Sequence, residues 1–349
     1  MKLTHSLIIA AALSFSLLTP LGAGAEEQGF LEKGEMSPLT IPHIYGFTWQ
    51  QAAAERKALC FQTYNNALRV MKEKISQKGF KKHSDGRLYY EADAIAAGRG
   101  QSSAKPVAVV LDLDETVIDN GTYDSWLLFY PDKFKSNSAS DAFFDYQSLS
   151  PDNAETIPGA VEFLKQCRSW GITPIYITNR DEKRHRASTL KTLRNLGLGS
   201  PTLEEELFCR DKTRDRRVSE QLVKENRCAP GSPAAKELLN NASDKAGRRK
   251  LAEAKYEVIG YFGDDLYDHP VIVDSSAKGA EARAQREEQV RKNSMHFGWD
   301  WFVLPNSVYG SWMEKSGIYP GQPKVPVEIL RQTAEPFDKW YEENNFKYK

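Results

Sequence analysis

Short runs of apolar residues, separated by stretches with helical spacing, recur along the middle of this chain. The runs are 107–113, 172–178, 205–208, 256–262 and 301–304. Strands that are apolar throughout must be covered on both faces, and parallel sheets joined by helices provide that cover. The sequence therefore predicts an α/β fold in which helices flank a parallel sheet.

The stretches between these runs have the spacing of amphipathic helices. Helices are predicted at 159–170, 184–196, 245–255 and 277–291. From Thr48 to Lys78 apolar side chains also recur every three or four residues, which predicts one helix or a pair of helices. The stretch from about 210 to 242 is highly charged and contains Pro and Gly, so it is expected to be a dispensable surface insertion.

Two carboxylates stand where the first apolar run ends, at Asp112 and Asp114. A buried strand does not accept an unpaired carboxylate, because its desolvation costs several kcal/mol. Both residues should therefore emerge at the C-terminal edge of the strand, where parallel sheets place their ligand sites. A lone Asp-x-Asp pair has a second interpretation, a helix cap beside a solvated loop acid.

Matching polar side chains follow the other predicted strands. The second run ends at Thr178 and is followed by Asn179, and a later run is followed by Asp264 and Asp268. Lys245 begins the helix that leads into that later run. Carboxylates at several strand ends, with a hydroxyl and an ammonium group, suit a divalent cation and a phosphoryl group. Mg²⁺ prefers such carboxylates, waters and a phosphate oxygen.

The sequence resembles the haloacid dehalogenase (HAD) superfamily, and within it the class C bacterial non-specific acid phosphatases. That class has a signature of four Asp and is related to the lipoprotein-type 5′-nucleotidases. The first motif matches it at Asp112, Asp114, Glu115, Thr116, Asn120 and Tyr123. Segments 157–163 and 304–312 also resemble the class, and the resemblance runs from about Ile41 to Trp312. It implies a HAD Rossmann-like parallel sheet flanked by helices, with a smaller mainly helical domain.

The resemblance also implies a role for each candidate residue. Asp112 would be the nucleophile, Asp114 the general acid and base, Thr178 the hydroxyl of motif II and Lys245 the lysine of motif III. Mg²⁺ would be the cofactor, held by Asp112, Asp114, Asp264 and Asp268, with Asp114 contributing its backbone carbonyl. Acidic neighbours and partial burial are expected to raise the pKa of Asp114, as a general acid needs.

Three further residues are predicted to contact the substrate: Asn179, Tyr309 and Trp126. Tyr309 is expected to stack on a nucleobase or an aromatic leaving group, with a structural tyrosine in a turn as the alternative. Trp126 lies in the region that covers the site in relatives. His185 is expected to be solvated on a basic helix face.

The motif III lysine has a second candidate. Lys212 follows Asp211 in a setting that also looks like the motif, but it lies far upstream of Asp264. Lys245 keeps the short helix-and-strand interval to Asp264 and is followed by an arginine pair. Lys245 is therefore preferred, and Lys212 is expected to lie in the solvated insertion.

These features predict an exported, Mg²⁺-dependent acid phosphatase. It would hydrolyse small phosphate monoesters, nucleoside monophosphates among them, through an aspartyl-phosphate. A phosphotransferase on the same scaffold and a non-catalytic binding or storage protein are the alternatives. The chain has 47 basic and 47 acidic residues, so its net charge attracts no nucleic acid polymer, and none is expected as a partner. Whether the protein forms a homodimer stays open.

The N-terminal 25 residues have the order of a cleaved secretory signal peptide. A basic start precedes an apolar run from Leu7 to Leu18, and Ala23 and Ala25 offer a cleavage site. No cysteine lies near that site, so neither a lipobox nor a stable membrane anchor is expected, and the protein is predicted to be periplasmic or secreted. The remaining chain divides into a helical region at 26–105, a phosphatase core at 106–312 with a cap segment at about 121–156, and a helical tail at 313–349.

Export permits disulfides among the four cysteines. Cys60 and Cys167 lie within apolar helical patterns and are expected to be buried thiols. Cys209 and Cys228 bracket a polar stretch, and a bridge between them stays open.

Overall fold

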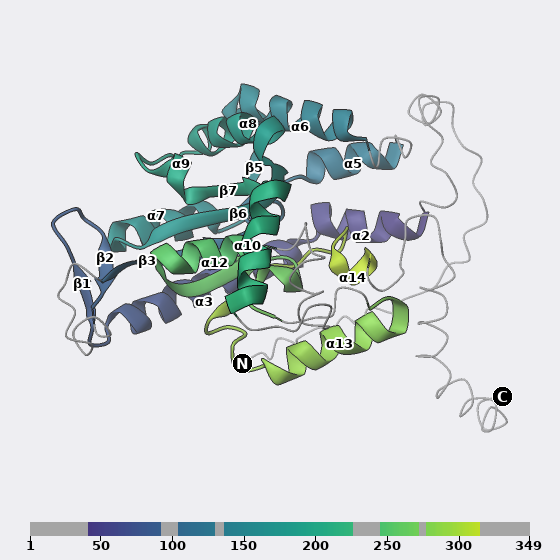
Figure 1. The fold of residues 1–349 in the computed structure, drawn as a ribbon. Helices are drawn as coiled ribbons and strands as arrows, with labels where there is room; N and C mark the ends of the chain where they lie inside the picture. The colour runs from purple at the N-terminus through teal and green to yellow at the C-terminus, as the bar shows by residue number, and fades with distance from the viewer. Residues whose placement is uncertain (1–40, 92–103, 130–135, 226–244, 272–276, 315–349) are drawn as a thin grey trace, which may run out of the picture.

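The computed structural model describes residues 41–91, 104–129, 136–225, 245–271 and 277–314 (Figure 1). The predicted signal peptide, most of the predicted C-terminal tail and Cys228 lie outside these residues. Within the described ranges, no helix is both long enough and apolar enough to cross a membrane.

A parallel sheet with the strand order β7-β6-β3-β8-β9 forms the centre of the molecule. Its strands are β3 (Lys105–Leu111), β6 (Thr173–Asp181), β7 (Leu207–Arg210), β8 (Glu257–Gly263) and β9 (Trp301–Val303). The predicted parallel sheet is therefore confirmed. An antiparallel hairpin of β1 (Phe80–Lys82) and β2 (Leu88–Tyr90) pairs with the first residues of β3, Lys105 and Pro106, so the N-terminal region is not purely helical.

β3 lies in the middle of the sheet because its side chains are apolar on both faces. Val107, Val109 and Leu111 pack in one core cluster, with side chains of α3 (Ala54–Ile75) and α7 (Ala160–Trp170). Ala108 and Val110 face the opposite side, where they pack with Ala252 of α12 (Ala246–Lys255). Alternate residues of a strand point to opposite faces, so this one strand ties both helical layers to the sheet.

Further helices gather over the C-terminal edge of the strands and along the flanks. α5 (Gly121–Phe129) and α6 (Asn137–Leu149) follow β3, and α6 packs against α8 (Glu182–Asn195). Figure 1 shows α5, α6 and α8 together at one end of the molecule, with α2 (Ile41–Ala52) beside α5. The other elements are β4 (Ile118–Asp119), β5 (Glu155–Thr156), α9 (Leu203–Glu206), α13 (Gly279–Lys292), α14 (Ser311–Glu314) and the 3-10 turns η3 (Pro151–Asn153) and η4 (Leu266–Asp268).

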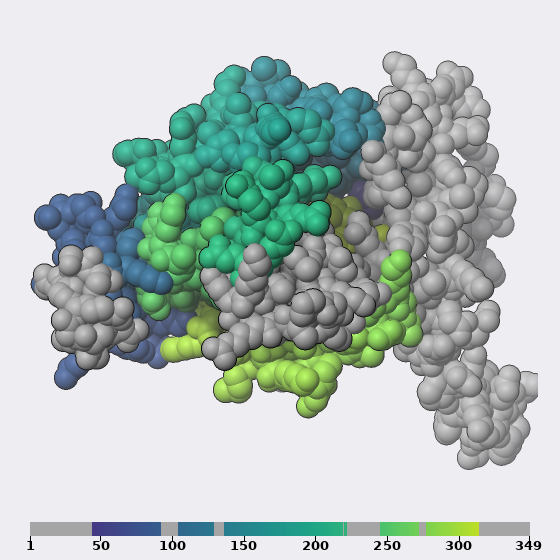
Figure 2. Space-filling model, in the orientation of Figure 1, coloured from purple at the N-terminus to yellow at the C-terminus, as the bar shows by residue number. Residues whose placement is uncertain are grey.

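The described part of the predicted insertion is a helix that belongs to the packed structure. α10 (Lys212–Glu225) packs against α12 and lies beside it across the front of the molecule (Figures 1 and 2). Asp215 of α10 is buried and lies 3.3 Å from the guanidinium of Arg248, which is itself fully buried in α12. The expectation of a solvated surface segment is therefore wrong for the part of α10 around Asp215, which a buried ion pair holds against α12. That the insertion can be shortened without loss of the site stays a prediction. Lys212 is exposed, as expected.

Three cysteines are buried, free thiols within the described residues. Cys60 of α3 and Cys167 of α7 confirm the prediction that they fill apolar helix faces. Cys209 of β7 is also a free, buried thiol. Its candidate partner, Cys228, lies outside the described residues, so the question of a bridge between them stays a prediction.

Candidate active site

The chain turns sharply where β3 ends and presents Asp112 and Asp114 at the edge of the sheet. The backbone N–H of Asp112 donates to the carbonyl of Phe262 on β8, at 3.0 Å, which fixes the first acid against the neighbouring strand. Glu115 has a φ of 55°, a left-handed conformation that is uncommon for a residue with a Cβ. Its buried carboxylate accepts the backbone N–H of Asn120 at 2.8 Å and so closes the loop.

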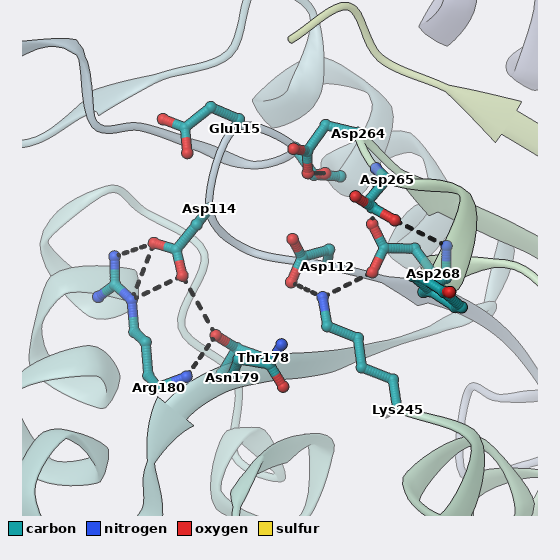
Figure 3. Close-up of polar contacts among 12 residues, drawn as sticks. Asp112, Asp114, Glu115, Thr178, Asn179, Arg180, Lys245, Asp264, Asp265 and Asp268 are labelled. Carbon is teal, nitrogen blue, oxygen red and sulfur yellow. Dashed lines mark hydrogen bonds and ion pairs between the residues drawn. The ribbon is translucent and has the colours of Figure 1, made fainter. Parts of the chain in front are cut away.

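Lys245 joins the first motif to the end of β8. Its ammonium group contacts Asp112 and lies 2.7 Å from Asp268 (Figure 3). Asp112, Lys245 and Asp268 are 8%, 6% and 5% exposed, respectively. Burial disfavours the charge of Lys245, but the two carboxylates outweigh it and raise the pKa of the lysine. The ammonium group is therefore charged and fixed beside Asp112.

Asp112, Asp264 and Asp268 form a cluster of three carboxylates. One oxygen of each lies within 4.8 Å of the others. Gly263 permits this close packing at the end of β8, since a Cβ at that position would lie 2.1 Å from the Cβ of Asp268. Asp264 accepts a hydrogen bond from the amide of Asn306 at 2.8 Å. Hard, closely spaced oxygen donors of this kind fit a small divalent cation.

Burial and the repulsion between neighbouring carboxylates disfavour the charged form of the acids in this cluster. Burial raises the pKa of Asp112 to about 7, because the nearby Asp268 and Asp114 add to desolvation and Lys245 only partly offsets both. Burial, with Asp112 and Asp268, also raises the pKa of Asp264 well above its usual value. A bound cation would relieve this repulsion, so the donor set fits a metal electrostatically as well as geometrically.

Asp114 points away from this cluster, toward Arg180 (Figure 3). Nη2 and Nε of Arg180 donate to its carboxylate at 2.8 and 3.1 Å, and Asn120 and Thr178 donate at 2.8 and 3.3 Å. Burial opposes ionisation of Asp114, but Arg180 outweighs it and lowers the pKa. The expected rise is therefore wrong, because an arginine rather than an acid is its nearest charged neighbour. The side chain is not one of the clustered metal-ligand candidates.

Arg180 is a site residue that sequence reasoning missed. It lies two positions after Thr178 on β6, so both side chains point to the same face of the strand. The alternation of side chains along the strand could have identified Arg180 from the sequence as a neighbour of Thr178. Its guanidinium is buried, donates to Gln147 of α6 at 3.0 Å and lies 4.1 Å from the ring centroid of Phe144. Arg180 thus connects Asp114 to the predicted cap segment.

Arg248 is the first arginine of the pair that follows Lys245, and the sequence analysis gave it no role of its own at the site. Its guanidinium donates to the backbone carbonyl of Thr178, and Nη2 donates to Oδ1 of Asn179 at 2.7 Å. It lies three residues after Lys245, near the start of the same helix. Arg248 therefore connects the end of β6 to the helix that begins beside Lys245.

A cavity of about 530 Å³ includes the carboxylate cluster in its wall. Asn179 and Tyr309 line it, which places these two predicted residues at the site. Trp126 does not line it: the side chain is 38% exposed and stacks on Tyr123, with ring centroids 6.0 Å apart. The prediction that Trp126 contacts the substrate is therefore not supported by its position. Tyr123 and Phe143, together with Tyr309, form an aromatic wall of the cavity.

His185 is buried, contrary to expectation. Its Nδ1 accepts the backbone N–H of Asp181 at 3.0 Å, and its Nε2 lies 2.5 Å from Asp141 of α6. The many basic residues of α8 suggested a solvated helix face, but the buried imidazole of His185 holds α8 against α6.

Comparison with known proteins agrees with this geometry. Residues 38–312 match the family described as HAD superfamily, subfamily IIIB (Acid phosphatase). Two solved structures of the class C acid phosphatase from Bacillus anthracis, one with tungstate bound, share the fold with a TM-score of 0.54. Each is 24% identical to this chain, and each match covers 79% of this chain and 89% of the other. The chain therefore belongs to subfamily IIIB of the HAD superfamily and is an acid phosphatase, a phosphomonoesterase of the hydrolase class.

Proposed function

We propose that this acid phosphatase is Mg²⁺-dependent and hydrolyses small phosphate monoesters, with nucleoside monophosphates among its substrates, through an aspartyl-phosphate on Asp112. The observation that carries the proposal is the position of Lys245, between Asp112 and Asp268 beside a three-carboxylate cluster. That arrangement combines a nucleophile, a fixed cation for phosphoryl oxygens and a set of metal ligands.

Asp112, Asp264 and Asp268 would hold the Mg²⁺, together with the backbone carbonyl of Asp114 that the family resemblance adds. When bound, the ion offsets the repulsion between a carboxylate nucleophile and a phosphate dianion. Specificity for Mg²⁺ is part of the proposal. The cluster supports it because carboxylates in a small buried site suit a hard cation.

Each catalytic side chain has a separate task. Asp112 attacks phosphorus, so that a carboxylate–phosphorus bond forms while the ester bond to the leaving group breaks. Asp114 gives a proton to the departing alkoxide and later takes one from the water that hydrolyses the aspartyl-phosphate. Because Arg180 lowers its pKa, the proton-donating step is favoured at low pH, whereas the proton-accepting step is not limited in this way. Lys245 and the hydroxyl of Thr178 hold the phosphoryl oxygens during both displacements. Arg180 and Asn120 orient Asp114 for its two proton transfers.

The aromatic wall supports nucleoside monophosphates as substrates. Tyr309, Tyr123 and Phe143 line the cavity, and the last two rings stack with centroids 4.7 Å apart. Flat aromatic side chains give a nucleobase a stacking surface without demanding one particular base. We expect no nucleic acid polymer as a partner, since the chain has no net charge. Export through a cleaved signal peptide at 1–25 also remains part of the proposal.

Phosphate release from a panel of nucleoside monophosphates and aryl phosphates, with and without Mg²⁺, tests the proposal. We expect turnover only with the metal, and phosphorylation at Asp112 when the reaction is quenched with acid. Turnover in metal-free protein, or label at another residue, would overturn it. A phosphotransferase would instead give less inorganic phosphate than alcohol product when an acceptor is added. N-terminal sequencing of exported protein tests cleavage after residue 25.

A further inference from the structure

The cavity over the carboxylate cluster has two walls of different chemistry. The aromatic wall of Tyr123, Phe143 and Tyr309 is accounted for by the proposed function. The other wall is polar and basic, and its side chains come from α6, α8 and the end of β7: Asn137, Ser140, Arg184, His185 and Arg210. Neither the metal nor the transferred phosphoryl group needs these residues.

The basic wall lies beyond the transferred phosphoryl group. Thr178, at the phosphoryl site, is three residues before Asp181 on β6, and Asp181 is paired in register with Arg210 on β7. The register shifts between Ile177, which pairs with Phe208, and Asp181, so Arg210 lies only two residues beyond Phe208. A strand rises about 3.3 Å per residue, so Arg210 is roughly 7 Å further along β7 than the residue that pairs with Ile177. A group bound there would belong to the leaving portion of a substrate.

Most positive charges around the cavity already have an acidic partner. Arg180 is paired with Asp114, and Lys245 with Asp112 and Asp268. Both cations are therefore already paired with acids of the active site.

Arg210 is different. It lines the cavity, and within the described ranges its side chain makes no hydrogen bond or ion pair. Its Nε is shut off from solvent without a hydrogen-bond partner. Its charge acts on Asp181, but Oδ1 of that carboxylate caps α8, where it accepts from the backbone of Lys183 and Arg184 and lies 3.7 Å from Nε of Arg184. A guanidinium with a buried, unsatisfied donor is costly unless a ligand supplies the acceptor.

Arg184 lies on the same wall and can supply a second donor. Its guanidinium is 2.8 Å from Asp141, but both side chains are more than one-third exposed. Exposed pairs of this kind contribute little to stability, so Arg184 can turn toward an anion in the cavity at small cost.

We propose that Arg210, assisted by Arg184, binds a second phosphate group of the substrate. The enzyme would then favour small esters that carry two phosphates separated by about the width of a ribose, such as nucleoside 3′,5′-bisphosphates. Guanidinium groups hold phosphate oxygens through paired, charge-assisted hydrogen bonds. The inference rests on the proposed function only in placing the reacting phosphate at Asp112.

Steady-state kinetics with matched substrates test this site. Phosphate release is measured for adenosine 5′-monophosphate and adenosine 3′,5′-bisphosphate, in the presence of Mg²⁺, with the wild type, Arg210→Gln and Lys212→Gln. We expect the ratio of kcat/KM for bisphosphate over monophosphate to fall about tenfold to a hundredfold in Arg210→Gln, mainly through KM. Lys212→Gln is the matched control, since Lys212 is an exposed cation two residues away that does not line the cavity. It should leave the ratio unchanged.

Additional measurements with salt, substitute variants and a second pair of substrates complete the test. The KM of the bisphosphate should rise more steeply with ionic strength than that of the monophosphate. If Arg210→Gln does not fold, Arg184→Gln and Arg210→Lys take its place, and smaller falls in the ratio are expected. An equal ratio in the wild type and the variants overturns the inference. A non-nucleotide pair, glycerol phosphate and a glycerate bisphosphate, separates this inference from the proposal that nucleotides are substrates. If nucleotides are not preferred but Arg210→Gln still lowers the ratio of bisphosphate to monophosphate turnover, only the nucleotide proposal is contradicted.

Discussion

At the scale of single residues, the site separates two acids that are only two positions apart in the chain. Asp112 faces Lys245 and the carboxylate cluster, whereas Asp114 faces Arg180 and Asn120. The left-handed backbone at Glu115 follows directly and turns the chain away from the strand. The two carboxylates therefore have different partners, and replacing Asp112 should affect catalysis differently from replacing Asp114.

Replacement of each motif I acid tests this division. Asp112→Asn removes the nucleophile at nearly constant volume, so turnover should fall roughly a thousandfold or more on every ester. Asp114→Asn should lower kcat most on alkyl esters, because an activated aryl leaving group departs without a proton. The measurement is kcat on paired alkyl and aryl phosphates, and equal losses on both would rule out Asp114 as the acid.

The motif III lysine is a second prediction at this scale. Lys245→Ala removes a buried ammonium group beside the nucleophile, and kcat should fall about a hundredfold to a thousandfold. Lys212→Ala serves as its control and should turn over like the wild type, since that side chain is exposed. The reverse pattern in two folded proteins would move the catalytic lysine upstream.

At the scale of elements, α10 is attached to the site through one buried pair. Asp215 of α10 faces Arg248 of α12, and Arg248 donates to the end of β6. Asp215→Ala would leave the Arg248 charge buried and poorly compensated, so we expect a loss of about 3–5 kcal/mol in the free energy of unfolding. Chemical denaturation measures it. Glu220→Ala, in an exposed pair on the same helix, is the control and should change stability little.

Another element-scale prediction concerns the contact between α3 and the turn before β9. Lys74 of α3 donates to Asp300 and, at 2.7 Å, to the carbonyl of Ile259. Partial burial opposes the ionisation of Asp300, but Lys74 and His296 outweigh it and lower the pKa. The folded state therefore favours the charged form. The stability from this carboxylate should be present above its unfolded pKa, near 3.8, and be lost as the pH falls through the lower folded value.

Asp300→Asn tests this dependence. Near pH 7 the variant should unfold with about 1–2 kcal/mol less free energy than the wild type, allowing for partial exposure of the acid. That difference should shrink as the pH is lowered below 4. A difference independent of pH would contradict the assignment. Glu288→Gln, in a solvent-exposed pair on α13, gives the baseline and should show little change.

At the scale of the whole molecule, the parallel sheet gathers the site. β3, β6 and β8 are neighbours in the sheet, although their ends lie far apart in the sequence. Their carboxyl ends meet at one edge, so Asp112 and Asp264 reach the same cavity, and the buried hydroxyl of Thr178 lies behind its wall and donates to Asp114. The metal proposed for this edge would thus link the end of β3 to the end of β8.

Metal binding should consequently affect both activity and global stability. Chelation should abolish phosphate release, and added Mg²⁺ should restore it. In excess, Mg²⁺ should also raise the Tm by about 2–4 °C, because it binds the folded state and relieves carboxylate repulsion. Calorimetry checks the shift, and Asp264→Asn should reduce it. Full activity in a chelated sample shown to contain no metal would contradict the proposal.

The sequence by itself determined the parallel sheet and the candidate acids at its edge. Apolar runs mark buried strands wherever they occur, and a carboxylate at the end of such a run must leave the core. Residues 112, 178, 245 and 264 could be found in this way because each lies in a local pattern that is independent of the rest of the chain. Tertiary structure alone decided which groups face each other. Arg180 lowers the pKa of Asp114, Arg248 connects α10 to the site, and Trp126 lies outside the cavity. These contacts join segments distant in the chain, and burial and charge at a side chain depend on such neighbours, which no local pattern encodes.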